Sequence, residues 1–103
     1  MTDFSQGDII KISGFKNRLF VIVSKNAFIK AAGLFHVCPM ISEIRDGPVH
    51  IFVSGKQGTN GVVICEQIKA IDPKVRGCNR IDILTYEDIM NVSDTVQGIF
   101  EYD

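Results

Sequence analysis

Few side chains of this sequence are suited to chemistry on a charged substrate, and they stand at the ends of apolar runs. Arg18 opens the run RLFVIVS, and its planar guanidinium is a fork of donors that matches a phosphate group. Glu66 follows the run GVVIC and precedes Lys69. Arg18 can equally form an ordinary surface ion pair, and Glu66 and Lys69 can be a solvated pair at a strand end. His36 and His50 lie inside strand-like runs and are expected to be structural.

A run of basic residues in the C-terminal half offers a second possible site. Lys69, Lys74, Arg76 and Arg80 can follow the phosphates of a nucleic acid, or they can form the solvated rim of the fold. The glycine-rich segment 55–61 is no phosphate loop, because it lacks the Gly-Lys-Ser/Thr sequence and no helix pattern follows it.

The composition indicates one folded domain over residues 1–103. The apolar fraction of 46% and the moderate charge argue against disorder. The formal net charge of −1 provides no global attraction for nucleic acid, so such a partner would need a local basic groove. No apolar run is long enough to cross a bilayer, and the start MTDFSQGD has neither the basic nor the apolar region of a signal peptide.

The three cysteines, Cys38, Cys65 and Cys78, are odd in number and lack the spacing of a metal site. Cys38 and Cys65 lie in apolar runs, where a free thiol behaves as a small hydrophobic side chain. These features predict free thiols, no bound metal and a reducing cytoplasm.

The stretch GVVICEQIKAIDP predicts a central strand that starts at Gly61 and emerges into solvent after Cys65. Asp72-Pro73 ends it, because proline has no amide hydrogen for the ladder. Pro39 lies near the end of another apolar run and predicts an edge strand or a bulge there. The other predicted strands cover residues 9–12, 18–24, 34–41, 49–54 and 78–84.

Two helices are predicted beside these strands. Residues 25–32 contain helix formers and end at Gly33, which is typical of a short helical turn closed by glycine. A longer amphipathic helix runs from Tyr86 to about Phe100, with Thr85 as its N-cap. Many strands followed by a terminal helix predict a small β-barrel or an α+β domain.

Ordered motifs along nearly the whole chain resemble the PemK/MazF family of toxin endoribonucleases. QGDII is similar to the family's opening GDIV strand, RLFVIVS to RPALVVS, VCPMIS to VCPITS and YEDIMNV to PETIMNEV. The family pattern GVVxCDQxRxIDxxxRG is matched at Gly61, Val62, Val63, Cys65, Gln67, Ile71, Asp72, Arg76 and Gly77. The resemblance implies a mainly β fold with helices (α+β): a small SH3-like or CcdB-like antiparallel β-barrel with a C-terminal helix.

The resemblance also implies which residues act. It aligns Arg18 with the family's catalytic or substrate-clamping arginine, and Glu66 with an aspartate that acts as the base in one branch of the family. The further residues expected to bind substrate are Ser42, Gln67, Lys69, Lys16 and Arg76. Metal-independent RNA cleavage needs a base for the 2′-hydroxyl proton, a cation for the charged phosphorane and an acid for the leaving oxygen, and it needs no cofactor.

A member of this family is expected to be the toxin of a toxin–antitoxin system, an mRNA interferase that cuts RNA in the cytoplasm and inhibits growth. The implied partners are single-stranded RNA, a cognate antitoxin protein and a second copy of the chain. DNA would be bound only as a complex with the antitoxin, and no membrane is involved.

Three departures from the family keep a second hypothesis open. The threonine of VCPITS is Ile41. The arginine that one branch of the family has two residues before the aspartate acting as its base is Ile64. The connection over residues 13–17 is shorter than the family's and lacks its histidine or glutamate. The alternative is a catalytically weakened or inactive binding module on the same scaffold, or a CcdB-like poison of a protein target.

We predict a homodimer joined through one self-complementary patch, because the strands carry more apolar surface than a chain of this length needs and the family acts as a symmetric dimer. Light scattering at tens of micromolar should return a mass about twice the 11.4 kDa of one chain. The mass of a monomer at that concentration would contradict the prediction.

Overall fold

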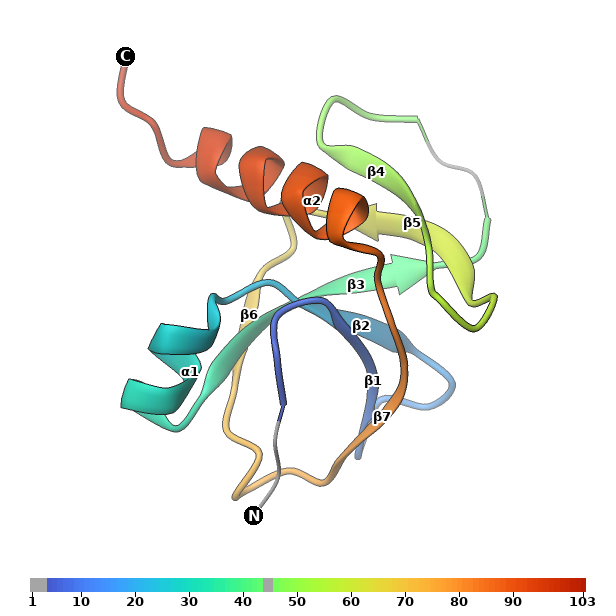
Figure 1. Ribbon diagram of the computed structural model, residues 1–103, viewed down its shortest axis with the longest axis vertical. Helices are drawn as coiled ribbons and strands as arrows, with labels where there is room; N and C mark the ends of the chain where they lie inside the picture. Colours follow the sequence, from blue (N-terminus) through green and yellow to red (C-terminus); the bar gives the residue numbers. More distant parts are fainter. Residues whose placement is uncertain (1–3, 44–45) are drawn as a thin grey trace.

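The computed structural model describes residues 4–43 and 46–103. Over these residues the chain forms a seven-stranded sheet, with all paired strands antiparallel, in the order β4-β5-β3-β2-β1-β7 and with β6 paired to β3. The strands are β1 (Asp8–Ile12), β2 (Leu19–Ile22), β3 (Phe35–Ile41), β4 (His50–Ser54), β5 (Asn60–Ile64), β6 (Lys69–Ile71) and β7 (Cys78–Ile83), and the helices are α1 (Asn26–Ala32) and α2 (Tyr86–Ile99). α2 lies across one side of the sheet and α1 lies beside the start of β3 (Figure 1). The predicted fold class, mainly β with a C-terminal helix, is confirmed.

The sheet curls until its two outermost strands meet. An isolated antiparallel bridge joins Gly55, which follows β4, to Leu84, which follows β7. The Asp82 carboxylate supports this junction, because it accepts hydrogen bonds from the backbone N–H of Gln57 at 3.0 Å and of Thr59 at 3.1 Å. Residue 55 has to be glycine, since a β-carbon there would overlap the same carboxylate. The sheet is therefore a small barrel closed near the β4–β5 loop.

Alternating residues of the strands fill two hydrophobic layers. The cross-strand neighbours Ile9, Val21 and Cys38 belong to the layer that packs against Val92 of α2. Residues of opposite parity form the second layer, which consists of Ile10, Ile12, Phe20, Ile22, Phe35, Val37 and Ile71. Burial of each large apolar side chain is worth roughly 1.5–3 kcal/mol, so a register shift by one residue, which would exchange the layers, is strongly disfavoured.

The structure corrects the prediction for Pro39, which lies in neither an edge strand nor a bulge. β3 is an interior strand, with β2 on one edge and both β5 and β6 on the other. β5 pairs with Met40 and Ile41, and β6 pairs with residues 35–37. Pro39 lies opposite the break between them, so its missing amide hydrogen removes no bond from that ladder. The single predicted strand after Gly61 is correspondingly two strands, separated by a turn at residues 65–68.

Both helices begin and end as their sequences predict. Gly33 closes α1 in the left-handed conformation (φ 74°), and its N–H donates to the Ile29 carbonyl. Thr85 caps α2, because its hydroxyl accepts the N–H of Asp88 at 3.3 Å. The Asp88 carboxylate in turn accepts the N–H of Ser54 at 2.9 Å, which ties the start of α2 to the end of β4. Neither helix in the described part of the chain is long and apolar enough to span a membrane.

The three cysteines are free thiols, as predicted. Burial, with added repulsion from Cys65 and Glu66, raises the pKa of the Cys38 thiol to about 12. Burial and the Glu66 charge raise the pKa of Cys65 to about 11. Both side chains therefore remain protonated at neutral pH and act as small hydrophobic residues.

Asp82 makes the stability of the barrel closure dependent on pH. Although burial alone would raise its pKa, hydrogen bonds from the backbone of Ile83, from the hydroxyl and backbone of Thr59 and from the backbone of Gln57 lower the pKa below the ordinary 3.8. Because the folded pKa is the lower one, this carboxylate stabilises the fold at pH values above its unfolded pKa. That contribution is lost as the pH falls through the folded pKa.

We therefore expect Asp82→Asn to lower the free energy of unfolding at pH 7 by about 1.5–3 kcal/mol, the usual worth of hydrogen bonds to a charged group. Urea unfolding measures this, with Asp94→Asn on the exposed face of α2 as the control. The difference between parent and Asp82→Asn should shrink as the pH drops below the ordinary carboxylate pKa. A difference that is the same at neutral and acid pH would contradict the role given to Asp82.

Candidate functional site

Arg18 lies at the rim of a surface hollow beside the end of β3. The hollow has a volume of about 230 Å³ and is lined by Asn17, Arg18, Leu19, Met40, Ile41, Ser42 and Asn60. The β2–β3 register, which pairs Leu19 with Met40, brings Arg18 to the end of β3 where Ser42 follows. Two predicted site residues, Arg18 and Ser42, are therefore neighbours, and both are exposed. A guanidinium, a hydroxyl and the amides of the two asparagines suit an anionic group such as a phosphate.

The β1–β2 loop (residues 13–18) gathers the predicted cations around one aromatic ring. The Lys69 Nζ lies 5.9 Å and the Arg76 guanidinium carbon 4.9 Å from the centre of the Phe15 ring. Phe15 is itself anchored by an edge-on contact with Phe20. Arg76 also donates to the Ser13 carbonyl at 3.2 Å. Lys16 and Arg18 belong to the same loop and are exposed, so the loop carries two cations besides the two that pack on Phe15.

Glu66 and Gln67 occupy the turn between β5 and β6, and both are exposed. The Glu66 carboxylate oxygen Oε2 lies 3.0 Å from Nε2 of His50. The His50 side chain is 11% exposed and that of Glu66 is 46% exposed, so the ring lies behind the carboxylate. Sequence reasoning assigned His50 a structural part only. Spacing along the chain gives no signal for this contact, which depends on the pairing of His50 with Ile64 across β4 and β5.

Arg18 and Glu66 lie on opposite edges of β3 but reach the same side of the sheet. The registers set Arg18 level with Ile41 and Val62, and Glu66 lies four residues beyond Val62. Two strand spacings across the sheet and about four residues along it therefore separate these backbones, a distance of roughly 15 Å. Arg18 is two residues before Phe20, so its side chain points to the same face of the sheet as that of Phe20, which faces away from α2. His50 is three residues before Val53, so the two side chains point to opposite faces of β4. Because Val53 packs under α2, His50 also faces away from the helix. Both long side chains can therefore reach a substrate that runs obliquely across β3.

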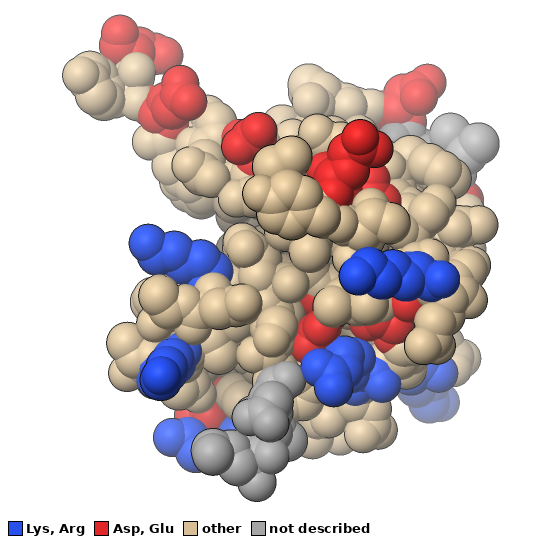
Figure 2. Space-filling model, in the orientation of Figure 1, with Lys and Arg blue, Asp and Glu red and all other residues tan. Residues whose placement is uncertain are grey.

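The side covered by α2 has the opposite charge. Figure 2 shows acidic side chains over α2 and the C-terminal segment, and basic side chains over the lower part of the same face. The acids of these elements are Glu87, Asp88, Asp94, Glu101 and Asp103, and residues 86–103 contain no lysine or arginine. An anionic partner is repelled from this helix and attracted to the basic area around Phe15.

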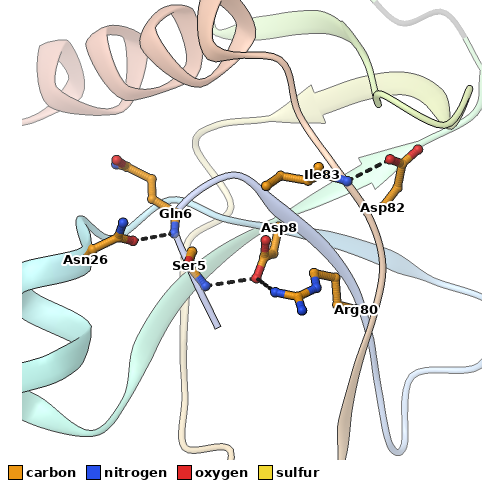
Figure 3. A network of polar contacts seen from close by, with 7 residues as sticks. All are labelled: Ser5, Gln6, Asp8, Asn26, Arg80, Asp82 and Ile83. Atoms are coloured by element: carbon orange, nitrogen blue, oxygen red, sulfur yellow. Dashed lines mark hydrogen bonds and ion pairs between the residues drawn. The ribbon is translucent and has the colours of Figure 1, made fainter. Parts of the chain in front are cut away.

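The basic run of the sequence does not act as one surface. The Arg80 Nη1 lies 3.2 Å from Oδ2 of Asp8, a carboxylate that is fully buried and also accepts the Ser5 N–H (Figure 3). Arg80 therefore neutralises a buried charge within the fold, whereas Lys69 and Arg76 line the β1–β2 loop. In the described part of the chain, no group of three or more His, Cys, Asp or Glu side chains is placed to hold a metal ion.

Comparison with known proteins gives one family and one fold. The family model for PemK-like, MazF-like toxins of type II toxin–antitoxin systems matches residues 5–100. The fold is that of MazE–MazF (Form-II) from Deinococcus radiodurans, with a TM-score of 0.80 at 17% identity, covering 98% of this chain and 100% of that chain.

Two further solved structures share the fold. An endoribonuclease in complex with its cognate antitoxin from Mycobacterial species has a TM-score of 0.76 at 16% identity, covering 98% of this chain and 100% of that chain. The Mycobacterium tuberculosis toxin MazF-mt6 has a TM-score of 0.71 at 18% identity, covering 93% of this chain and 98% of that chain. No curated protein matches the chain.

Proposed function

Because the chain belongs to the family of PemK-like and MazF-like toxins of type II toxin–antitoxin systems, we propose that it is an endoribonuclease that cuts single-stranded RNA without a metal ion and thereby inhibits growth. The observation that carries this proposal is the position of Arg18, at the rim of a hollow and within the loop that gathers Lys16, Lys69 and Arg76. This arrangement supplies a cation for a reacting phosphate and further cations for its neighbours along the strand.

In the proposed reaction Glu66 is the base and Arg18 stabilises the transition state. The Glu66 carboxylate takes the proton of a ribose 2′-hydroxyl, and the 2′-oxygen attacks the adjacent phosphorus. The Arg18 guanidinium donates to the phosphorane oxygens as their charge develops. The bond to the 5′-oxygen breaks, that oxygen takes a proton from water or an acid of the site, and a 2′,3′-cyclic phosphate remains.

The residues that hold the strand are proposed from the same geometry. Ser42 shares the hollow with Arg18, and Gln67 shares the turn with Glu66. Lys69 and Arg76 lie against the Phe15 ring, and Lys16 follows Phe15 in the same loop. These three cations are proposed to contact phosphates on one side of the scissile bond.

The proposed partners follow from the same surfaces. Similar structures include complexes of MazE with MazF and an endoribonuclease with its cognate antitoxin. We infer that a cognate antitoxin, presenting acidic residues, covers the basic loop of a homodimer, and that DNA is bound only by that complex. The site of action is the cytoplasm, where RNA is available and thiols stay reduced.

A second candidate function is a binding module with little or no activity. Ile41 lines the hollow beside Arg18, where the family motif has a threonine, and a methyl group cannot donate to a phosphorane. Losing one such donor typically costs about 10²–10³ in rate, so the chain is expected to be a slow enzyme at best.

Incubation of the purified protein with long single-stranded RNA in EDTA tests the proposal. We expect slow cleavage that leaves 2′,3′-cyclic phosphate ends. Arg18→Ala and Glu66→Gln should each lower the rate about 10²–10³-fold, because each removes a group that acts in the transition state. Lys56→Ala, at an exposed position of the β4–β5 loop, is the control and should cut like the parent.

Ile41→Thr extends the same experiment in the opposite direction. A hydroxyl beside Arg18 adds a donor to the hollow and should raise the cleavage rate. If Arg18→Ala cuts as fast as the parent, the proposed site is wrong. If neither the parent nor Ile41→Thr cuts RNA while the chain still binds a partner protein, the binding module is the correct function.

A further inference from the structure

His50 and Glu66 form a pair that joins an almost buried imidazole to a solvent-facing carboxylate. The 3.0 Å distance between Nε2 and Oε2 is that of a good hydrogen bond. An ionised carboxylate can only accept, so Nε2 carries the hydrogen in this pair. The second ring nitrogen, Nδ1, faces the backbone at Gly47.

The backbone holds this ring in one place. His50 is the first residue of β4, and its N–H donates to the Gly47 carbonyl at 3.3 Å. A β-carbon at Gly47 would lie 2.5 Å from Nδ1, so only glycine leaves room for the imidazole. A ring fixed by a strand and a close-fitting turn costs little additional entropy when it orients a neighbour.

The negative charge of Glu66 acts on groups inside the fold as well as at its surface. Repulsion from this carboxylate contributes to the raised pKa of both buried thiols, Cys38 and Cys65. His50 is the hydrogen-bond donor to its Oε2 atom.

We propose that His50 is a positioning residue for Glu66: its Nε2–H fixes one carboxylate oxygen, and so fixes the plane of the base on the side of the sheet that carries Arg18. This inference rests on the proposed RNA cleavage. During the reaction Glu66 gains the 2′-hydroxyl proton and becomes neutral, while His50 keeps its own proton throughout. A fixed carboxylate needs no reorientation before it takes that proton, which lowers the barrier without strengthening RNA binding.

The substitution His50→Leu tests this, with His50→Gln as the conservative variant that keeps a donor. We expect His50→Leu to lower kcat about 10–100-fold, as loss of an orienting partner typically does, while KM changes little. His50→Gln should retain most of the activity. His36→Leu is the matched control, because His36 bonds to Ser24 at 2.9 Å and has no part in the site. Melting temperatures of all variants separate loss of folding from loss of rate.

A double-mutant comparison distinguishes positioning from a merely structural contact. If His50 acts through Glu66, adding His50→Leu to Glu66→Gln should lower kcat no further. A further loss equal to that of the single substitution would overturn the inference, as would full activity of His50→Leu in the parent.

In the protein without RNA, the ¹⁵N spectrum of the imidazole should show a protonated Nε2 whose shift changes in Glu66→Gln. An Nε2 that is unprotonated, or insensitive to Glu66→Gln, overturns the inference while the proposed function stands. A parent that cuts no RNA overturns the proposed function, and the inference with it.

Discussion

The candidate site depends on how β3 is paired. One edge of this strand is paired with β2, and the other is divided between β5 and β6. At the break, the turn of residues 65–68 leaves the ladder and carries Glu66 to the surface. On the opposite edge, Arg18 enters β2 from a short loop. β3 is thus the scaffold across which two groups, distant in sequence, can meet on one substrate.

The net charge of the chain does not reveal the local basic surface that an anionic partner would meet. Several acidic side chains stabilise the fold. Asp82 holds the β4–β5 loop through backbone amides, and the buried Asp8 is paired with Arg80. Others are confined to α2 and the segment after it. Lys69 and Arg76, by contrast, pack against Phe15 of the β1–β2 loop on the other side of the sheet. A formal charge of −1 is therefore compatible with a local basic area.

Local patterns predicted the fold well and the site only in part. The alternation of apolar residues, the Thr85 cap and Gly33 each report on neighbours in sequence, and the structure has the elements that they indicate. The break opposite Pro39 was mispredicted because it depends on which strands pair with β3. The contact of His50 with Glu66 was missed for the same reason, since the register of β4 on β5 creates it. The family motifs suggested Arg18 and Glu66 as site residues, but no motif spacing could show that β3 separates them.

The central claim is that RNA lies across β3 on the side of the sheet away from α2. The most direct measurement is amide NMR of the protein with a single-stranded oligonucleotide whose 2′-hydroxyls are replaced by hydrogen, so that it binds without being cut. We predict that the shifted amides fall in residues 13–18, in Ser42 and in residues 65–69, and that those of α2 stay in place. Shifts confined to α2, or spread evenly over the surface, would contradict the account.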